Sequence, residues 1–218
     1  MATAPLAYIE GLRNFYGIDF LVNRSTLIPR FETEQLVEKT IALLKKSGRS
    51  SPKILDLGTG CGAVAVMLKR MLPGSTVTAT DISVQALNVA RSNAARQQVE
   101  LNFCQSDLFE KIDEQFDLII ANLPYVPASR WRFLEDQVRS YEPKCAIVAG
   151  RDGLKVIKRL CLEVGNYLNQ RGIVALEIDG NHKERVSRLL QLALPHHRCY
   201  VQSDLSGRDR FAFAVARQ

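Results

Sequence analysis

Residues 53–62 read Lys-Ile-Leu-Asp-Leu-Gly-Thr-Gly-Cys-Gly, and this stretch decides the fold. Its apolar first half predicts a buried strand, and glycines at every second position predict a sharp turn into a helix over residues 63–71. Glycines also let a ligand approach the backbone closely. The spacing is Gly-x-Gly-x-Gly, unlike the dinucleotide Gly-x-Gly-x-x-Gly. A P-loop is excluded because no Gly-Lys-Ser/Thr follows.

Strands and helices alternate outward from this stretch. Upstream, the pattern predicts a helix over residues 33–46, with either Thr33 as its N-cap or Pro29 marking its entry. It also predicts a short hairpin over residues 14–22 around Gly17. Downstream, it predicts strands at 76–80, 101–105, 116–121, 173–178, 199–203 and 210–216, and helices at 84–97, 154–169 and 182–193. This alternation predicts an α/β fold: a mostly parallel sheet with helices on both faces, closed by an antiparallel pair.

Acidic residues follow three of these strands. Asp81 ends the second strand, where a carboxylate can accept hydrogen bonds from ribose hydroxyls. Asp107 and Leu108 follow the third strand and are placed to border an adenine. Asp56 lies at the start of the glycine loop, and we assign it to the neighbourhood of a ligand's ammonium group. Together these residues predict a nucleoside pocket.

The fourth strand ends in Asn122-Leu123-Pro124-Tyr125. The Asn122 side-chain oxygen and the Leu123 carbonyl are neighbouring acceptors, so a planar NH2 group can donate one hydrogen to each. Pro124 favours an extended Leu123, and Tyr125 offers an aromatic face to a flat group. This geometry would aim the nitrogen at an electrophilic methyl. It suits an amide or an adenine amino group.

The composition narrows the class of protein. The net charge of +6 is spread along the chain, so it fits proximity to RNA or the ribosome as well as a solvated basic surface. The five cysteines are scattered without a Cys-x-x-Cys, which argues against a disulfide framework or a metal site and favours a cytoplasmic protein. No signal peptide or membrane segment is expected. The histidines at 182, 196 and 197 are expected on the surface, away from the catalytic residues.

The chain resembles the PrmC/HemK family, the release factor glutamine N5-methyltransferases. The stretch Leu-Ile-Pro-Arg-Phe-Glu-Thr-Glu at 27–34 is the most distinguishing part of the resemblance. Further matching segments are 5–9, 15–17, 54–62, 81–83, 86–87, 107–109, 122–125, 142–143, 150–154, 176–178 and 204–210.

The resemblance implies a Rossmann-like, seven-stranded S-adenosylmethionine-dependent methyltransferase fold with an N-terminal β-hairpin. We expect an N-terminal segment over 1–30 and a catalytic domain over 31–218. Combined with the assignments above, the expected cofactor contacts are Asp56, Gly58, Thr59, Gly60, Cys61, Gly62, Asp81, Ile82, Asp107, Leu108 and Asn122.

The resemblance also implies an acceptor and the residues that act on it. Asn122, Pro124 and Tyr125 are the expected catalytic residues, and Asn122 through Tyr125 are expected to bind the substrate. The implied substrate is the glutamine of a Gly-Gly-Gln loop in a peptide chain release factor.

Some features depart from the family pattern. Leu123 and Phe31 stand where proline is usual, and Asp179 stands where glycine is usual. The family's N-terminal helical domain is missing, so we expect a truncated or naturally short member. Asn-Leu-Pro-Tyr also occurs in rRNA adenine dimethyltransferases. N6-adenine methylation of rRNA, tRNA or DNA is therefore the alternative function, and an inactive binding module is the third.

Overall fold

One sheet organises residues 3–217, the part of the chain that the computed structural model describes. Within these residues seven strands lie in the order β5-β4-β3-β6-β7-β9-β8. Their bounds are β3 Lys53–Leu57, β4 Thr76–Asp81, β5 Asn102–Gln105, β6 Phe116–Ala121, β7 Leu168–Glu177, β8 His197–Ser203 and β9 Asp209–Ala216. Strands β3 to β7 pair in parallel, and β9 is antiparallel to both of its neighbours. The predicted parallel sheet and its antiparallel closing pair are confirmed.

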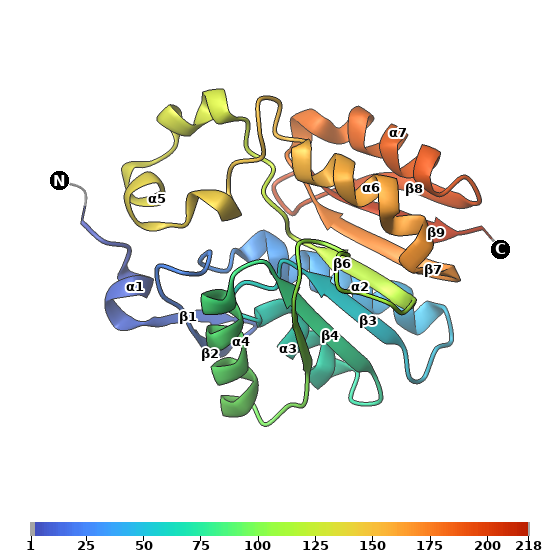
Figure 1. The fold of residues 1–218 in the computed structure, drawn as a ribbon, viewed down its shortest axis with the longest axis horizontal. Coiled ribbons are helices and arrows are strands. Elements are labelled where there is room, and N and C mark those ends of the chain that lie inside the picture. Colours follow the sequence, from blue (N-terminus) through green and yellow to red (C-terminus); the bar gives the residue numbers. More distant parts are fainter. Residues whose placement is uncertain (1–2, 218) are drawn as a thin grey trace.

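Helices cover both faces of the sheet (Figure 1). On one side lie α2 (Phe31–Lys46), α3 (Ala63–Met71) and α4 (Val84–Arg96), and on the other lie α6 (Lys155–Tyr167) and α7 (Lys183–Ala193). Alternate residues of each central strand therefore point into separate cores. In β3, Ile54 packs with the first helix layer and Leu55 with the second. Burial on both sides explains the nearly continuous apolar sequence of these strands.

The N-terminal segment forms the predicted hairpin. After α1 (Leu6–Glu10), strands β1 (Leu12–Phe15) and β2 (Ile18–Leu21) are joined by Tyr16 and Gly17, both at positive φ. Phe15 and Phe20 are fully buried in the core that α2 and α3 also share. The division at residue 30 stays a prediction.

Asn93 of α4 joins this hairpin to the glycine loop. Its Oδ1 accepts from Leu21 N at 2.7 Å, and its Nδ2 donates to Leu21 O at 2.9 Å and to Cys61 O at 2.8 Å. Asn93 is 1% exposed, and its bond to Cys61 O is fully buried. A single buried amide therefore connects two parts of the chain that are distant in sequence.

The segment between β6 and α6 contains short helices that the sequence pattern did not predict. These are η1 (Ala128–Phe133), α5 (Asp136–Tyr141) and η2 (Lys144–Ala146). Figure 1 shows α5 and α1 at the same end of the molecule, beyond the carboxyl ends of the parallel strands. Glu142 connects this segment to the N-terminal one, because its carboxylate accepts from Ile28 N at 3.2 Å and pairs with Arg30.

Some local predictions were wrong. Helix α2 begins at Phe31 with Arg30 as its N-cap, so Thr33 lies inside the first turn and is free to bond elsewhere. Helix α6 ends at Tyr167, and β7 starts directly at Leu168, well before the expected residue 173.

Two of the three histidines were also misplaced, whereas His196 is exposed as expected. His182, which ends the short helix η3 (Gly180–His182), and His197 are both buried. His197 Nε2 lies 3.2 Å from the Gly172 carbonyl, so this ring packs inside the fold. Burial lowers the pKa of both imidazoles.

Candidate functional site

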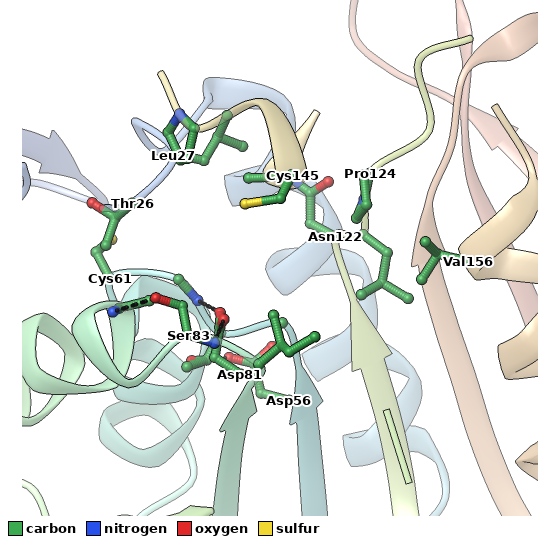
Figure 2. A pocket seen from close by; sticks show the side chains of 18 of the residues that line it. Thr26, Leu27, Asp56, Cys61, Asp81, Ser83, Asn122, Pro124, Cys145 and Val156 are labelled. Atoms are coloured by element: carbon green, nitrogen blue, oxygen red, sulfur yellow. Dashed lines mark hydrogen bonds between the residues drawn. The ribbon is translucent and has the colours of Figure 1, made fainter. Parts of the chain in front are cut away.

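A cavity of about 540 Å³ opens at the carboxyl ends of β3, β4 and β6. Figure 2 shows Asp56 and Asp81 on its floor, Asn122 and Pro124 on one wall, and Thr26 and Leu27 across from them. Cys145 also lines the cavity. Ligands bind at this edge of open α/β sheets, where the strand order reverses. Every residue expected to contact the cofactor lines this cavity except Gly62, which is the residue before α3.

The glycine loop is shaped by contacts on both sides. Gly58, Gly60 and Gly62 all have positive φ values, which side chains disfavour. A Cβ at Gly58 would lie 3.0 Å from the Leu123 side chain, and one at Gly62 would lie 2.9 Å from Ala90 Cβ. Gly60 faces open space. The loop thus lies against the Asn-Leu-Pro-Tyr corner and leaves room for a ligand at its centre.

Asp81 is held in place by backbone amides. Its Oδ2 accepts from Gly60 N at 3.0 Å and its Oδ1 from Ser83 N at 2.9 Å. Each carboxylate oxygen retains acceptor capacity for a further donor. Burial raises the pKa of Asp81, and the two backbone hydrogen bonds oppose that rise. Asp81 is therefore suited to accept from vicinal hydroxyls in the cavity.

Asp56 is the most buried acid on the cavity floor, at 2% exposure. Thr59 Oγ1 donates to its Oδ2 at 2.6 Å. Burial raises the pKa of Asp56 to about 7, although the hydrogen bond from Thr59 lowers it. A cation bound next to Asp56 would favour the ionised carboxylate.

Asp107 and Leu108 form the far end of the cavity. Both Asp107 oxygens accept from Arg159 Nη1 at 3.0 Å, so this carboxylate is already paired in the structure. Leu108 is buried with a φ of 52°, an unusual conformation for a residue with a side chain. Ile82 is 60% exposed and lines the same end of the cavity.

At the Asn-Leu-Pro-Tyr corner, Asn122 is linked by hydrogen bonds to two residues that the sequence did not assign to the site. Asn122 Nδ2 donates to Thr33 Oγ1 at 3.0 Å, and Thr33 Oγ1 donates to Glu177 Oε2 at 2.7 Å. Among the described residues, no donor contacts Asn122 Oδ1 or the Leu123 carbonyl. Both acceptors that the sequence singled out are therefore unused, beside the cavity.

Tyr125 lies on the other side of the corner. It lines a second cavity of about 410 Å³ with Arg130, Asp179, Arg208 and Arg210, whereas Asn122, Leu123 and Pro124 line the first. Its hydroxyl donates to Glu177 Oε1 at 3.1 Å. Burial and the neighbouring Glu177 charge raise the pKa of Tyr125, so the hydroxyl stays protonated.

Sequence reasoning missed several lining residues. Thr33 and Leu27 lie within the distinguishing 27–34 stretch, but nothing in its pattern indicated which side chains face the cavity. Cys145 gave no signal, because it belongs to the segment without periodicity. Glu177, buried at the end of β7, lines neither cavity but accepts hydrogen bonds from Thr33 and from the Tyr125 hydroxyl of the corner.

Within residues 3–217, no cluster of three or more His, Cys, Asp or Glu side chains suits a metal ion. No helix in this part of the chain is long and apolar enough to cross a membrane.

Known proteins resemble this chain in sequence. Residues 32–139 match the family described as the Methyltransferase small domain. A release factor glutamine methyltransferase from Bacillus cereus is 38% identical over 214 residues, which cover 96% of this chain and 76% of that protein.

Solved structures share the fold at lower sequence identity. A ribosomal protein L11 methylase from Lactobacillus delbrueckii matches with a TM-score of 0.60 at 20% identity, covering 85% of this chain and 80% of its own. A 16S rRNA methyltransferase from T. thermophilus, in complex with AdoMet and guanosine, matches with a TM-score of 0.67 at 17% identity. That alignment covers 94% of this chain and 50% of the other. These matches confirm the seven-stranded methyltransferase fold.

Proposed function

This chain belongs to the release factor glutamine methyltransferases, and from that premise we propose that its acceptor is the glutamine of a Gly-Gly-Gln loop. It is a methyltransferase, and its cofactor is S-adenosylmethionine. The observation that carries the acceptor proposal is the orientation of Asn122. With Nδ2 bonded to Thr33, its oxygen is left for a substrate.

The cavity residues fit this cofactor. Asp81 would accept from the ribose hydroxyls with the lone pairs that Gly60 and Ser83 leave unused. Asp56 would lie near the ammonium group, directly or through water. Leu108, backed by the Asp107–Arg159 pair, would border the adenine. When bound, the cofactor supplies a methyl group on a positively charged sulfur.

The corner would hold the acceptor nitrogen. A glutamine amide donates one hydrogen to Asn122 Oδ1 and the other to the Leu123 carbonyl, which fixes its plane. This nitrogen would take the methyl from the bound cofactor, whose sulfonium would become a thioether, and would release one proton to solvent. Because the amide lone pair is delocalised, the nitrogen is a weak nucleophile. Alignment is therefore the main contribution of these residues.

The flanking glycines of such a loop suit this corner. They add no side chains and adopt unusual backbone angles, so the glutamine can extend into a narrow site. Tyr125 borders the corner from the second cavity and is proposed to pack on the amide plane. An extruded base would need more space and contacts to its phosphates.

The test is mass spectrometry of a purified release factor incubated with the protein and cofactor. We expect one added methyl on the loop glutamine, and none when that glutamine is replaced by asparagine. Total RNA and DNA are offered in parallel with labelled cofactor. Label at adenine with an unmodified release factor would reject the proposal in favour of base methylation. A cytoplasmic location and proximity to RNA or the ribosome stay predictions.

A further inference from the structure

Thr33 and Glu177 have no part in the chemistry described above, yet they lie buried directly behind Asn122. Thr33 is 4% exposed and Glu177 is 2% exposed. They come from different elements, the first turn of α2 and the last residue of β7. The fold therefore brings a hydroxyl and a carboxylate from opposite ends of the sequence to one side-chain amide.

The hydrogen bonds in this group have a defined direction. Thr33 Oγ1 donates to Glu177 Oε2, so the single hydroxyl hydrogen of Thr33 points to Glu177. The Thr33 oxygen is then an acceptor toward Asn122, and only the Nδ2 side of the amide can satisfy it. Asn122 Oδ1 must consequently face away from Thr33.

The same carboxylate also holds the other end of the corner. Glu177 Oε1 accepts from the Tyr125 hydroxyl while Oε2 accepts from Thr33. Burial raises the pKa of Glu177, and the hydrogen bonds from Thr33 and Tyr125 and the nearby Arg210 charge oppose that rise. One buried group thus sets the orientation of Asn122 and Tyr125 together.

We propose that Glu177, acting through Thr33, is a positioning residue that selects an acceptor able to donate two N–H hydrogen bonds. This inference rests on the proposed function of the Asn122 corner. A glutamine amide satisfies both Asn122 Oδ1 and the Leu123 carbonyl. A glutamate carboxylate would offer only lone pairs to these acceptors, so the site excludes it. With Asn122 rotated by half a turn, its Nδ2 would face the substrate and this selection would be lost.

Four variants separate positioning from general stability. Thr33→Val removes the hydroxyl at nearly constant shape, and Thr33→Ser keeps it. Glu177→Gln supplies an NH2 group that can donate to the Thr33 oxygen. The Thr33 hydroxyl hydrogen is then free to donate to Asn122 Oδ1. Thr40→Val is the matched control, because Thr40 is a fully buried threonine of the same helix that bonds only within it, to Leu36 O.

Two measurements are made on each variant, with melting temperatures to verify folding. The first is the ¹⁵N NMR signal of the Asn122 side-chain amide, assigned by its loss in Asn122→Asp. The second is kcat and KM for the release factor, with the cofactor Kd measured by calorimetry. The NMR signal requires no substrate, so it reports on the positioning even if the acceptor is misassigned.

We expect Thr33→Val and Glu177→Gln to shift the Asn122 amide signal and speed its hydrogen exchange. In the same variants kcat/KM should fall about tenfold or more, with the cofactor Kd within about threefold of wild type. Thr33→Ser and Thr40→Val should resemble wild type in both measurements.

The inference is overturned if Thr33→Val leaves the amide signal unchanged, or if Thr33→Ser and Thr40→Val lose as much activity as Thr33→Val. If the wild-type protein methylates no release factor but the amide signals follow the expected pattern, the proposed function fails and the positioning role stands.

Discussion

Replacing Asn122 should separate the effect on catalysis from the effect on cofactor binding. All three of Asn122, Asp81 and Asp56 line the cavity, and in the proposed arrangement Asn122 faces the acceptor while Asp81 and Asp56 face the ribose and the ammonium group. We therefore expect Asn122→Ala to lower kcat by about a hundredfold or more while the cofactor Kd changes little. Calorimetry and single-turnover kinetics measure the two effects.

The matched variants are Leu123→Pro and Asp81→Ala. Leu123→Pro keeps the carbonyl acceptor, so its turnover should stay within about threefold of wild type. Asp81→Ala should weaken cofactor binding, since each lost charge-assisted hydrogen bond costs about 1.5–3 kcal/mol. Wild-type turnover in Asn122→Ala would disprove alignment by this side chain.

Asp56 makes cofactor binding depend on pH. Burial raises its pKa to about 7, so part of the population carries a neutral carboxyl near neutrality. Because a cationic ammonium favours the carboxylate, cofactor affinity should rise between about pH 6 and pH 8. Calorimetry across this range should show the rise, and Asp56→Asn should flatten it. An equal slope in the variant would assign the effect to another group.

The raised pKa of Asp56 has the opposite effect on stability, because it lowers the free energy of unfolding as pH rises. The folded protein binds the Asp56 proton more tightly than the unfolded chain, whose carboxyl titrates near 3.8. The contribution of Asp56 is therefore fully present below that value and is lost as pH rises toward about 7. Denaturation at several pH values should show a shallower decline over this window in Asp56→Asn.

At the scale of elements, Glu142 is a buried acid that joins the segment after α5 to the segment before α2. Glu142 accepts from Ile28 N and pairs with Arg30, and its side chain is 1% exposed. Glu142→Gln should lower the free energy of unfolding by about 1–3 kcal/mol, since a buried donor loses its charged partner. It should also weaken cofactor binding, because Leu27 and Pro29 line the cavity.

Urea denaturation measures this loss, with Glu114→Gln as the control. Glu114 forms an exposed pair with Lys53, so its replacement should change the unfolding free energy by less than about 1 kcal/mol. Equal losses in the two variants would contradict a special role for Glu142.

The sequence predicted the helices and strands whose apolar residues repeat at a spacing set by burial. It did not predict the features that depend on contacts between residues distant in sequence. Strand β6 was placed correctly because both of its faces are covered and its residues are apolar. The η1–α5–η2 segment was missed because neither its short helices nor their flanks repeat apolar residues at a fixed spacing. Thr33 was misread as a cap because its true partner, Glu177, lies 144 residues away.

The candidate site divides in the same way. The glycine loop, Asp81 and the Asn-Leu-Pro-Tyr corner each follow a strand, so sheet topology brings them to one cavity. Thr26, Cys145 and Arg159 join them only through the course of loops and the docking of α6. The placement of Tyr125 on the second cavity also depends on the path after β6, which no local pattern specifies.

At the scale of the whole molecule, the Asn93 amide makes the hairpin and the glycine loop one thermodynamic unit. In the proposed arrangement the cofactor would stabilise the loop at Cys61, and Asn93 connects Cys61 to Leu21. Opening of the hairpin therefore becomes less favourable when the cavity is filled, although Phe15 is the one residue of β1 and β2 that lines it. Hydrogen–deuterium exchange should slow in both strands on cofactor binding, and Asn93→Ala should abolish that protection. By reciprocity, whatever tightens the hairpin raises cofactor affinity by the same factor, so a partner that docks there acts as an allosteric effector.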